Sequence, residues 1–195
     1  RRWKDFLQQH AKDIWACDFL TVRTLTFQSL YVFFLLHHVT REIVHVRVTR
    51  HPTAAWTAQQ ITNACFEREP PKYLIRDRDS IYGSEFSRKA NSLCLHEARA
   101  PVRAPKANAI AERFVGTMRR ECLDHVFIFN ERHLQRIMEE FVGYYNRQRP
   151  HRSLHHRSPC PTATPVPGTS TGPPRGVILA EPVLGGLHHV YKRAA

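Results

Sequence analysis

The sequence predicts an α/β fold in which a mixed sheet, with three antiparallel strands followed by parallel strands, is flanked by helices. Two patterns predict this class. Three strand-like segments come first and are joined by short polar connections, as in an antiparallel meander. Helical and strand-like segments then alternate, which is typical of parallel strands joined by helices that cover the faces of a sheet.

The three leading strands differ in their patterns. Residues 14–20 form an apolar run that contains Asp18, and residues 29–37 form a continuous apolar run typical of a central strand. Residues 42–49 alternate between apolar and polar side chains, which indicates a strand with one buried face. Residues 1–12 mix charged and aromatic side chains and are predicted to form a short lead-in helix.

The next segments alternate between helix and strand. Thr53 or Pro52 can start a helix over residues 54–67, and two prolines at 70–71 end it. A short strand is predicted at 73–76, a helix at 85–93 and a further strand at 94–98.

Two longer helices follow, at residues 106–121 and 131–145. In the first, one helical stripe is apolar, and a different stripe carries Asn108, Glu112, Gly116 and Arg119. The core-facing side of this helix is therefore separate from a side with a carboxylate and a cation.

Composition shifts divide the chain into four parts. We expect a lead-in segment at 1–13, a core domain at 14–157, a linker rich in Pro, Thr and Gly at 158–176 and a tail at 177–195. The tail regains apolar residues, so it is expected to dock as a strand or hairpin, or to bind a partner. Neither methionine lies at the start, so translation is expected to begin upstream of Arg1.

The chain is strongly basic. Its 195 residues carry a formal net charge of +12 with a pI near 10.0, which indicates a polyanionic partner, with nucleic acid ahead of an anionic membrane surface. The longest apolar run, residues 30–36, is too short to span a bilayer, so no membrane is expected. The five cysteines are dispersed without a close pair, which indicates reduced thiols in a cytoplasmic protein.

Three acidic residues are notable in such a basic chain. Asp18 lies inside the first apolar run, Asp77 directly follows the strand at 73–76, and Glu112 lies on the helix at 106–121. Carboxylates brought together repel one another unless cations lie between them, and Mg²⁺ or Mn²⁺ prefers carboxylate oxygen. Two such ions can stabilise the attacking and leaving oxygens of a displacement at phosphorus.

Three motifs occur in a fixed order along the chain. They are Ile75-Arg76-Asp77-Arg78-Asp79-Ser80-Ile81-Tyr82-Gly83, then Asn108-Ala109-Ile110-Ala111-Glu112-Arg113-Phe114, then Tyr145-Asn146 followed by Arg149-Pro150-His151. Together with Asp18, they resemble the catalytic core of retroviral-type integrases and insertion-sequence transposases, the Asp-Asp-Glu family.

The resemblance implies a ribonuclease H-like fold and a metal-dependent reaction. Asp18, Asp77 and Glu112 would be both the catalytic residues and the ligands of two Mg²⁺ or Mn²⁺ ions. The implied function is cleavage of DNA phosphodiester bonds and strand transfer into target DNA by a homo-oligomer. The implied location is the cytoplasm, at a bacterial-type nucleoid.

One position departs from the family pattern. The residue two places after the second Asp is usually Gly, and here it is Asp79. We prefer Asp77 as the ligand because it directly follows the strand, whereas Asp79 is better suited to accept a backbone N–H in a turn.

Several residues near these motifs are expected to contact DNA. Basic side chains beside such a site are suited to hold backbone phosphates, which supplies affinity without sequence choice. The predicted contacts are Arg103, Lys106, Asn108, Arg113, Arg119, Arg120 and Arg149.

Two other functions are compatible with the sequence. The chain could be a degenerate copy that binds DNA without cutting it, or a ribonuclease H-like nuclease that does not integrate DNA. The three acidic residues argue against the first alternative, and the motif from Tyr145 to His151 argues against the second.

Overall fold

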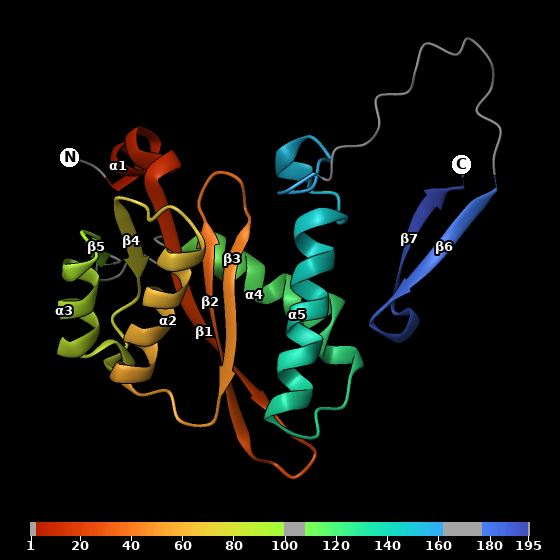
Figure 1. Ribbon diagram of the computed structural model, residues 1–195, viewed down its shortest axis with the longest axis horizontal. Coiled ribbons are helices and arrows are strands. Elements are labelled where there is room, and N and C mark those ends of the chain that lie inside the picture. The colour runs from red at the N-terminus through yellow and green to blue at the C-terminus, as the bar shows by residue number, and fades with distance from the viewer. Residues whose placement is uncertain (1–2, 100–107, 162–176, 195) are drawn as a thin grey trace.

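The computed structural model describes residues 3–99, 108–161 and 177–194. Its main body is a five-stranded sheet with helices on both faces, and a two-stranded hairpin follows it (Figure 1). The elements, in chain order, are α1 Trp3–His10, η1 Ala11–Asp13, β1 Ile14–Arg23, β2 Ser29–His37, β3 Ile43–Thr49, α2 Ala54–Glu67, β4 Tyr73–Arg76, η2 Ser80–Tyr82, α3 Ser84–Ser92, β5 His96–Arg99, α4 Ala109–Glu121, η3 Leu123–His125, α5 Glu131–Arg147, η4 Arg152–Leu154, β6 Ile178–Val183, η5 Leu184–Gly186 and β7 His188–Arg193, where η marks a 3₁₀ helix.

The sheet order is β3-β2-β1-β4-β5. The pairs β1–β2 and β2–β3 are antiparallel, and the pairs β1–β4 and β4–β5 are parallel. This arrangement confirms the predicted fold class, including the antiparallel meander at the start of the chain. It also puts the end of β4 beside the middle of β1.

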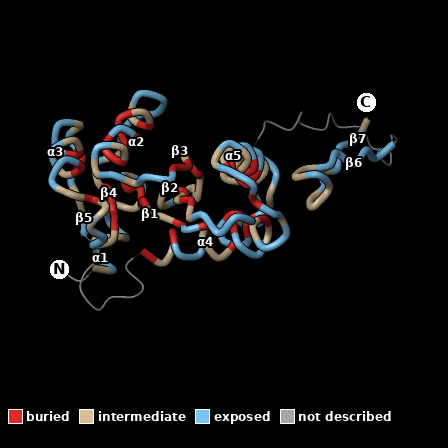
Figure 2. The backbone as a smooth tube through the Cα atoms, turned by 90° about the horizontal axis from the view of Figure 1, so that it is seen from below, coloured by how far each residue is buried: buried red, intermediate tan, exposed pale blue. Residues whose placement is uncertain are grey.

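The core has one apolar cluster on each face of the sheet. On β1, Ala16 and Leu20 point to the side covered by α4 and α5, whereas Trp15 and Cys17 point to the side covered by α2 and α3. Figure 2 shows α2 and α3 on one side of the sheet and α4 on the other. Because side chains alternate along a strand, Asp18 is on the α4 side.

Local sequence signals account for most element boundaries. Thr53 caps α2, and its hydroxyl accepts the N–H of Trp56 at 3.2 Å. Asn130 caps α5 in the same way, accepting the N–H of His133 at 2.9 Å. Both helices begin where the sequence predicts. By contrast, β5 begins at His96 rather than at 94, because Cys94 has a positive φ of 58° and lies in a turn.

The tail forms a hairpin, which is one of the alternatives predicted for it. Its turn contacts α5, where the backbone N–H of Leu184 donates to Glu140 Oε1 at 2.5 Å. The ring of His188 stacks on Tyr144, with the ring centroids 4.6 Å apart. Most of the linker predicted at 158–176 lies outside the described residues, so the four-part division of the chain stays a prediction.

Candidate active site

Asp18 and Asp77 occupy matching positions on neighbouring parallel strands. The register of β1 and β4 pairs Ala16 with Ile75. Asp18 lies two residues beyond Ala16, and Asp77 lies two residues beyond Ile75, immediately after β4 ends at Arg76. Because alternate residues of a strand point to the same face, both carboxylates are directed to the α4 side of the sheet.

The third predicted carboxylate, Glu112, is exposed in the first turn of α4. Asn108, the residue that caps this helix, is 8% exposed, and its side-chain amide donates to the carbonyl of Cys17 at 3.3 Å. The start of α4 is therefore fixed to β1 at the residue before Asp18. Asn108 was predicted to contact DNA, and its observed contact is with the protein backbone.

The carboxyl of Asp18 has a raised pKa. Burial, together with the negative charges of Asp77, Glu112 and Asp79, raises the pKa of Asp18 from 3.8 to about 6. A hydrogen bond from the Phe19 N–H to Asp18 Oδ1, 2.8 Å long, opposes this rise. The pKa of Asp18 thus reflects a partly buried carboxyl with other carboxylates gathered around it.

The two aspartates after β4 both organise the turn. Asp77 Oδ1 accepts the N–H of Asp79 at 3.1 Å, and Asp79 Oδ1 accepts the N–H of Ile81 at 3.1 Å. Asp79 therefore caps η2, the turn role expected for it. Asp77 also has a turn contact, through one of its two carboxylate oxygens.

A buried ion pair that was not predicted from the sequence supports this edge of the sheet. Arg76 is 3% exposed, and its Nε donates to Glu97 Oε2 at 2.5 Å, which joins β4 to β5. The Arg76 guanidinium also lies 5.1 Å from the ring centroid of Tyr82. Arg76 and Tyr82 belong to the motif at 75–83, and Arg76 Nη1 also donates to the carbonyl of Asp77 at 3.1 Å.

The residue types fit a hard divalent cation, because the acids supply only oxygen ligands. In the described parts of the chain, no group of three or more His, Cys, Asp or Glu side chains is arranged to hold a metal ion.

The predicted DNA contacts are dispersed along α4 and beyond. Arg103 and Lys106 lie outside the described residues. Arg113, Arg119 and Arg120 are exposed on α4. Exposure on α4 does not test a contact with DNA, so DNA binding by these three arginines stays a prediction.

The last motif has a structural explanation. Asn146 at the end of α5 exchanges two hydrogen bonds of 2.9 Å with the backbone N–H and C=O of Ile43 at the start of β3. Arg149 forms two bonds to the Glu121 carboxylate, of 2.6 and 2.5 Å, which connect the segment after α5 to the end of α4. The motif therefore joins α4, α5 and β3 to one another.

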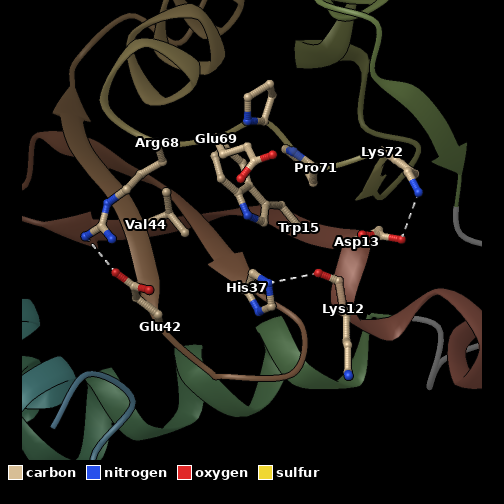
Figure 3. A pocket seen from close by; sticks show the side chains of 11 residues that line it. Lys12, Asp13, Trp15, His37, Glu42, Val44, Arg68, Glu69, Pro71 and Lys72 are labelled. Atoms are coloured by element: carbon tan, nitrogen blue, oxygen red, sulfur yellow. Dashed lines mark hydrogen bonds and ion pairs between the residues drawn. The ribbon is translucent and has the colours of Figure 1, made fainter.

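A separate cavity of about 390 Å³ opens near the start of β1 and the end of α2 (Figure 3). Its charged side chains are largely paired: Arg68 with Glu42 at 2.7 Å, and Lys72 with Asp13 at 3.5 Å. It contains none of the predicted site residues. In addition, no helix within the described ranges is long and apolar enough to cross a membrane.

Sequence comparison identifies a family match. The model of the family described as the integrase core domain matches residues 95–159, a range that includes Glu112 and the motif from Tyr145 to His151.

Two relatives come from bacterial insertion elements. An uncharacterized 31.7 kDa protein of insertion element IS407 from Burkholderia multivorans is 25% identical over 168 residues, covering 83% of this chain and 58% of the relative. The putative transposase InsD of insertion element IS2E from Escherichia coli is 29% identical over 140 residues, covering 68% of this chain and 64% of the relative. The chain thus spans about three fifths of the length of these relatives.

Solved structures share the fold. A chain of the simian T-cell lymphotropic virus intasome aligns with a TM-score of 0.64 at 13% identity, covering 93% of this chain and 66% of that one. The catalytic core domain of HTLV-2 integrase in complex with magnesium aligns with a TM-score of 0.60 at 11% identity, covering 76% of this chain and 93% of that one. At such low identity these neighbours establish the ribonuclease H-like fold alone. The family match over residues 95–159, the insertion-element relatives and the shared fold agree with the sequence motifs, and together they support an integrase or transposase catalytic core.

Proposed function

We propose that this chain catalyses metal-dependent cleavage of DNA phosphodiester bonds and strand transfer, as a transposase or integrase of the Asp-Asp-Glu type. The observation that carries the proposal is geometric: neighbouring parallel strands place Asp18 and Asp77 at matching positions, and the start of α4, which carries Glu112, is fixed to β1 beside Asp18. Such a set of acids is unfavourable for an apo protein, and it is suited to bind divalent cations, which in turn attract phosphate.

In the proposed site, Asp18, Asp77 and Glu112 hold the metal. Asp18 and Asp77 are fixed by neighbouring strands, and the exposed Glu112 has the freedom to close onto them from α4. Two Mg²⁺ or Mn²⁺ ions bound there would allow all three carboxylates to ionise and would stabilise charge on the attacking and leaving oxygens. The magnesium-containing HTLV-2 integrase core supports this choice of metal.

The reaction then has two displacements at phosphorus. In the first, a water oxygen attacks the phosphodiester at an element end, and the 3′-oxygen leaves as a hydroxyl. In the second, that hydroxyl attacks a phosphodiester of target DNA, whose own 3′-oxygen leaves. The chain's contribution is to orient the reacting groups, for which the contact of Asn108 with Cys17 keeps the start of α4 beside Asp18.

We also propose that the chain acts on DNA as a homo-oligomer in the bacterial cytoplasm. A neighbour solved as an intasome supports assembly, and the insertion-element relatives support a bacterial setting. The net charge of +12 is consistent with binding to a polyanion.

The test is Mn²⁺-dependent nicking of supercoiled plasmid DNA, which needs no knowledge of the element's end sequence. Wild-type protein is expected to nick, whereas Asp18→Asn is not, because the ligand charge is lost. Asp124→Asn, an exposed acid on η3, is the matched control and is expected to nick like the wild type. A wild-type chain that neither nicks DNA nor binds Mn²⁺ would favour the non-catalytic alternative. Nicking without joining of a pre-cut end to plasmid would favour the nuclease alternative.

A further inference from the structure

A second pocket lies along α4, the helix that carries Glu112. Its volume is about 330 Å³, and it is formed by α4, the end of α5, the β2–β3 turn and η4. Five of its lining residues are arginines, which are Arg41, Arg113, Arg120, Arg149 and Arg152. Arg41 and Arg152 were not among the DNA contacts predicted from the sequence.

The positive charge of this pocket is mostly uncompensated. Arg149 is paired with Glu121. Within the described part of the chain, none of the other four arginines has a carboxylate at ion-pair distance. Burial lowers the pKa of Arg41, and the neighbouring charge of Arg113 lowers it further. Like charges therefore converge here, which is unfavourable unless an anion occupies the pocket.

The walls of the pocket are rigidly held. Tyr145 is 5% exposed and packs edge-to-face against Phe114 and His151, with ring centroids 4.9 and 4.4 Å apart. Burial lowers the pKa of His151, and its Nε2 lies 3.2 Å from the Tyr145 carbonyl, so the ring is a neutral support. Arg41 Nη1 donates to the His38 carbonyl at 2.6 Å, which orients its guanidinium.

A gap on α4 helps to position one of the arginines. Gly116 has no side chain, and a Cβ placed there would come within 3.0 Å of Arg120 Nη1. The Arg120 guanidinium therefore lies against the helix.

We propose that this arginine pocket binds a phosphate group of the DNA backbone beside the reacting phosphodiester. The proposal rests on the proposed function, which supplies the DNA. Guanidinium groups suit phosphate because their planar forks donate two hydrogen bonds to one anion. The three aromatic rings that line the pocket, those of Phe114, Tyr145 and His151, are buried, so they offer no open face on which a base could stack. The chemistry is that of backbone recognition without base readout.

The distance along α4 from Glu112 to Arg120 agrees with binding of a phosphate a few nucleotides away from the reacting phosphodiester. A helix rises about 1.5 Å per residue, so Glu112 and Arg120 are separated by about 12 Å along the axis. One strand of DNA advances about 3.4 Å per phosphate. A phosphate three or four steps from a phosphodiester held at the carboxylates would thus lie level with the far end of the pocket.

The test compares two double variants with equal loss of charge. Arg41→Gln with Arg152→Gln removes two pocket arginines, whereas Arg88→Gln with Lys89→Gln removes two cations from α3, which covers the other face of the sheet. Binding to a fluorescent duplex of arbitrary sequence is measured by anisotropy over a range of KCl concentrations. Thermal unfolding of each variant confirms that it is folded, and Arg152→Gln alone serves if the double variant is not.

The pocket variant is expected to reduce the slope of log affinity against log salt by about 0.9, the contribution of one neutralised phosphate, relative to the α3 variant. Equal slopes for the two double variants would overturn the proposal. A second arm uses inorganic phosphate at matched ionic strength. If phosphate raises the Tm of the wild type and not of the pocket variant, while their DNA slopes agree, the pocket binds a small anion and the proposal is wrong.

Plasmid nicking separates this proposal from the proposed function. A reduced slope of log affinity against log salt in the pocket variant, with no nicking by the wild type, would support phosphate binding in the pocket and reject catalysis. Nicking by the wild type, with equal salt slopes for the pocket variant and the α3 variant, would support catalysis and reject phosphate binding in the pocket.

Discussion

Replacing Asp18 with Asn is expected to stabilise the metal-free protein. The pKa of Asp18 is raised by burial and nearby carboxylates from 3.8 to about 6, so its ionised form favours the unfolded state. One pKa unit corresponds to about 1.4 kcal/mol, so this penalty is about 3 kcal/mol once both states are ionised. An Asn side chain carries no charge and retains an oxygen to accept the Phe19 N–H.

The sign of the pH dependence follows from the raised pKa. At about pH 4 the carboxyl is protonated in the folded state and about half protonated in the unfolded state, so the penalty is small. It grows as pH rises from the ordinary pKa of 3.8 and is complete above about 6. The stabilising effect of Asp18→Asn should therefore be largest at pH 8 and nearly absent near pH 4.

The assay is thermal unfolding in EDTA at pH 8 and at pH 4. For a chain of this size, 1 kcal/mol shifts Tm by about 2–4 °C, so about 3 kcal/mol corresponds to roughly 6–12 °C at pH 8. Asp124→Asn, at an exposed position, is the control and is expected to leave Tm unchanged. An Asp18→Asn protein with the same Tm as the wild type at pH 8, or a lower one, would refute the reasoning.

Three further predictions concern metal, DNA and the last motif. Millimolar Mg²⁺ should raise the Tm of the wild type and not of Asp18→Asn. The rise should be larger at pH 7 than at pH 5, because the ion competes with the proton of the Asp18 carboxyl, whose pKa is about 6. An equal rise at both pH values would contradict this. Reversing the charge of Arg119 and Arg120 together, both exposed on α4, should reduce the salt dependence of duplex binding measured by anisotropy, and an unchanged slope would mean that DNA follows another path. Asn146→Ala should destabilise the fold by about 1–3 kcal/mol in chemical unfolding, because it leaves the Ile43 N–H and C=O without their partner, and a neutral effect would contradict that account of the motif.

Much of the fold was predictable because its signals are local. The continuous apolar run of β2 marks a strand with both faces covered, and the caps at Thr53 and Asn130 mark helix starts. The order of helices and strands then restricts the sheet topology. The start of β5 was missed because Cys94 adopts a left-handed turn that its residue type does not indicate.

The candidate site was predictable only in part. The positions of Asp18 and Asp77 follow from β-strand alternation and from the register of two parallel strands. The buried pair of Arg76 with Glu97 and the approach of Arg41 to Arg113 depend on segments brought together by the fold. Such contacts leave no periodic pattern in a single sequence. From the sequence alone, a turn arginine such as Arg41 cannot be distinguished from an ordinary solvent-exposed arginine.

The central claim is that Asp18, Asp77 and Glu112 bind metal together, with Asp79 acting in the turn. The direct measurement is Mn²⁺ binding, followed by electron paramagnetic resonance of the free ion, for the wild type, Asp77→Asn and Asp79→Asn. We expect Asp77→Asn to lose binding and Asp79→Asn to retain most of it, because Asp79 is used to cap η2. Wild-type affinity in Asp77→Asn, with loss of binding in Asp79→Asn, would contradict the account and move the metal site by two residues.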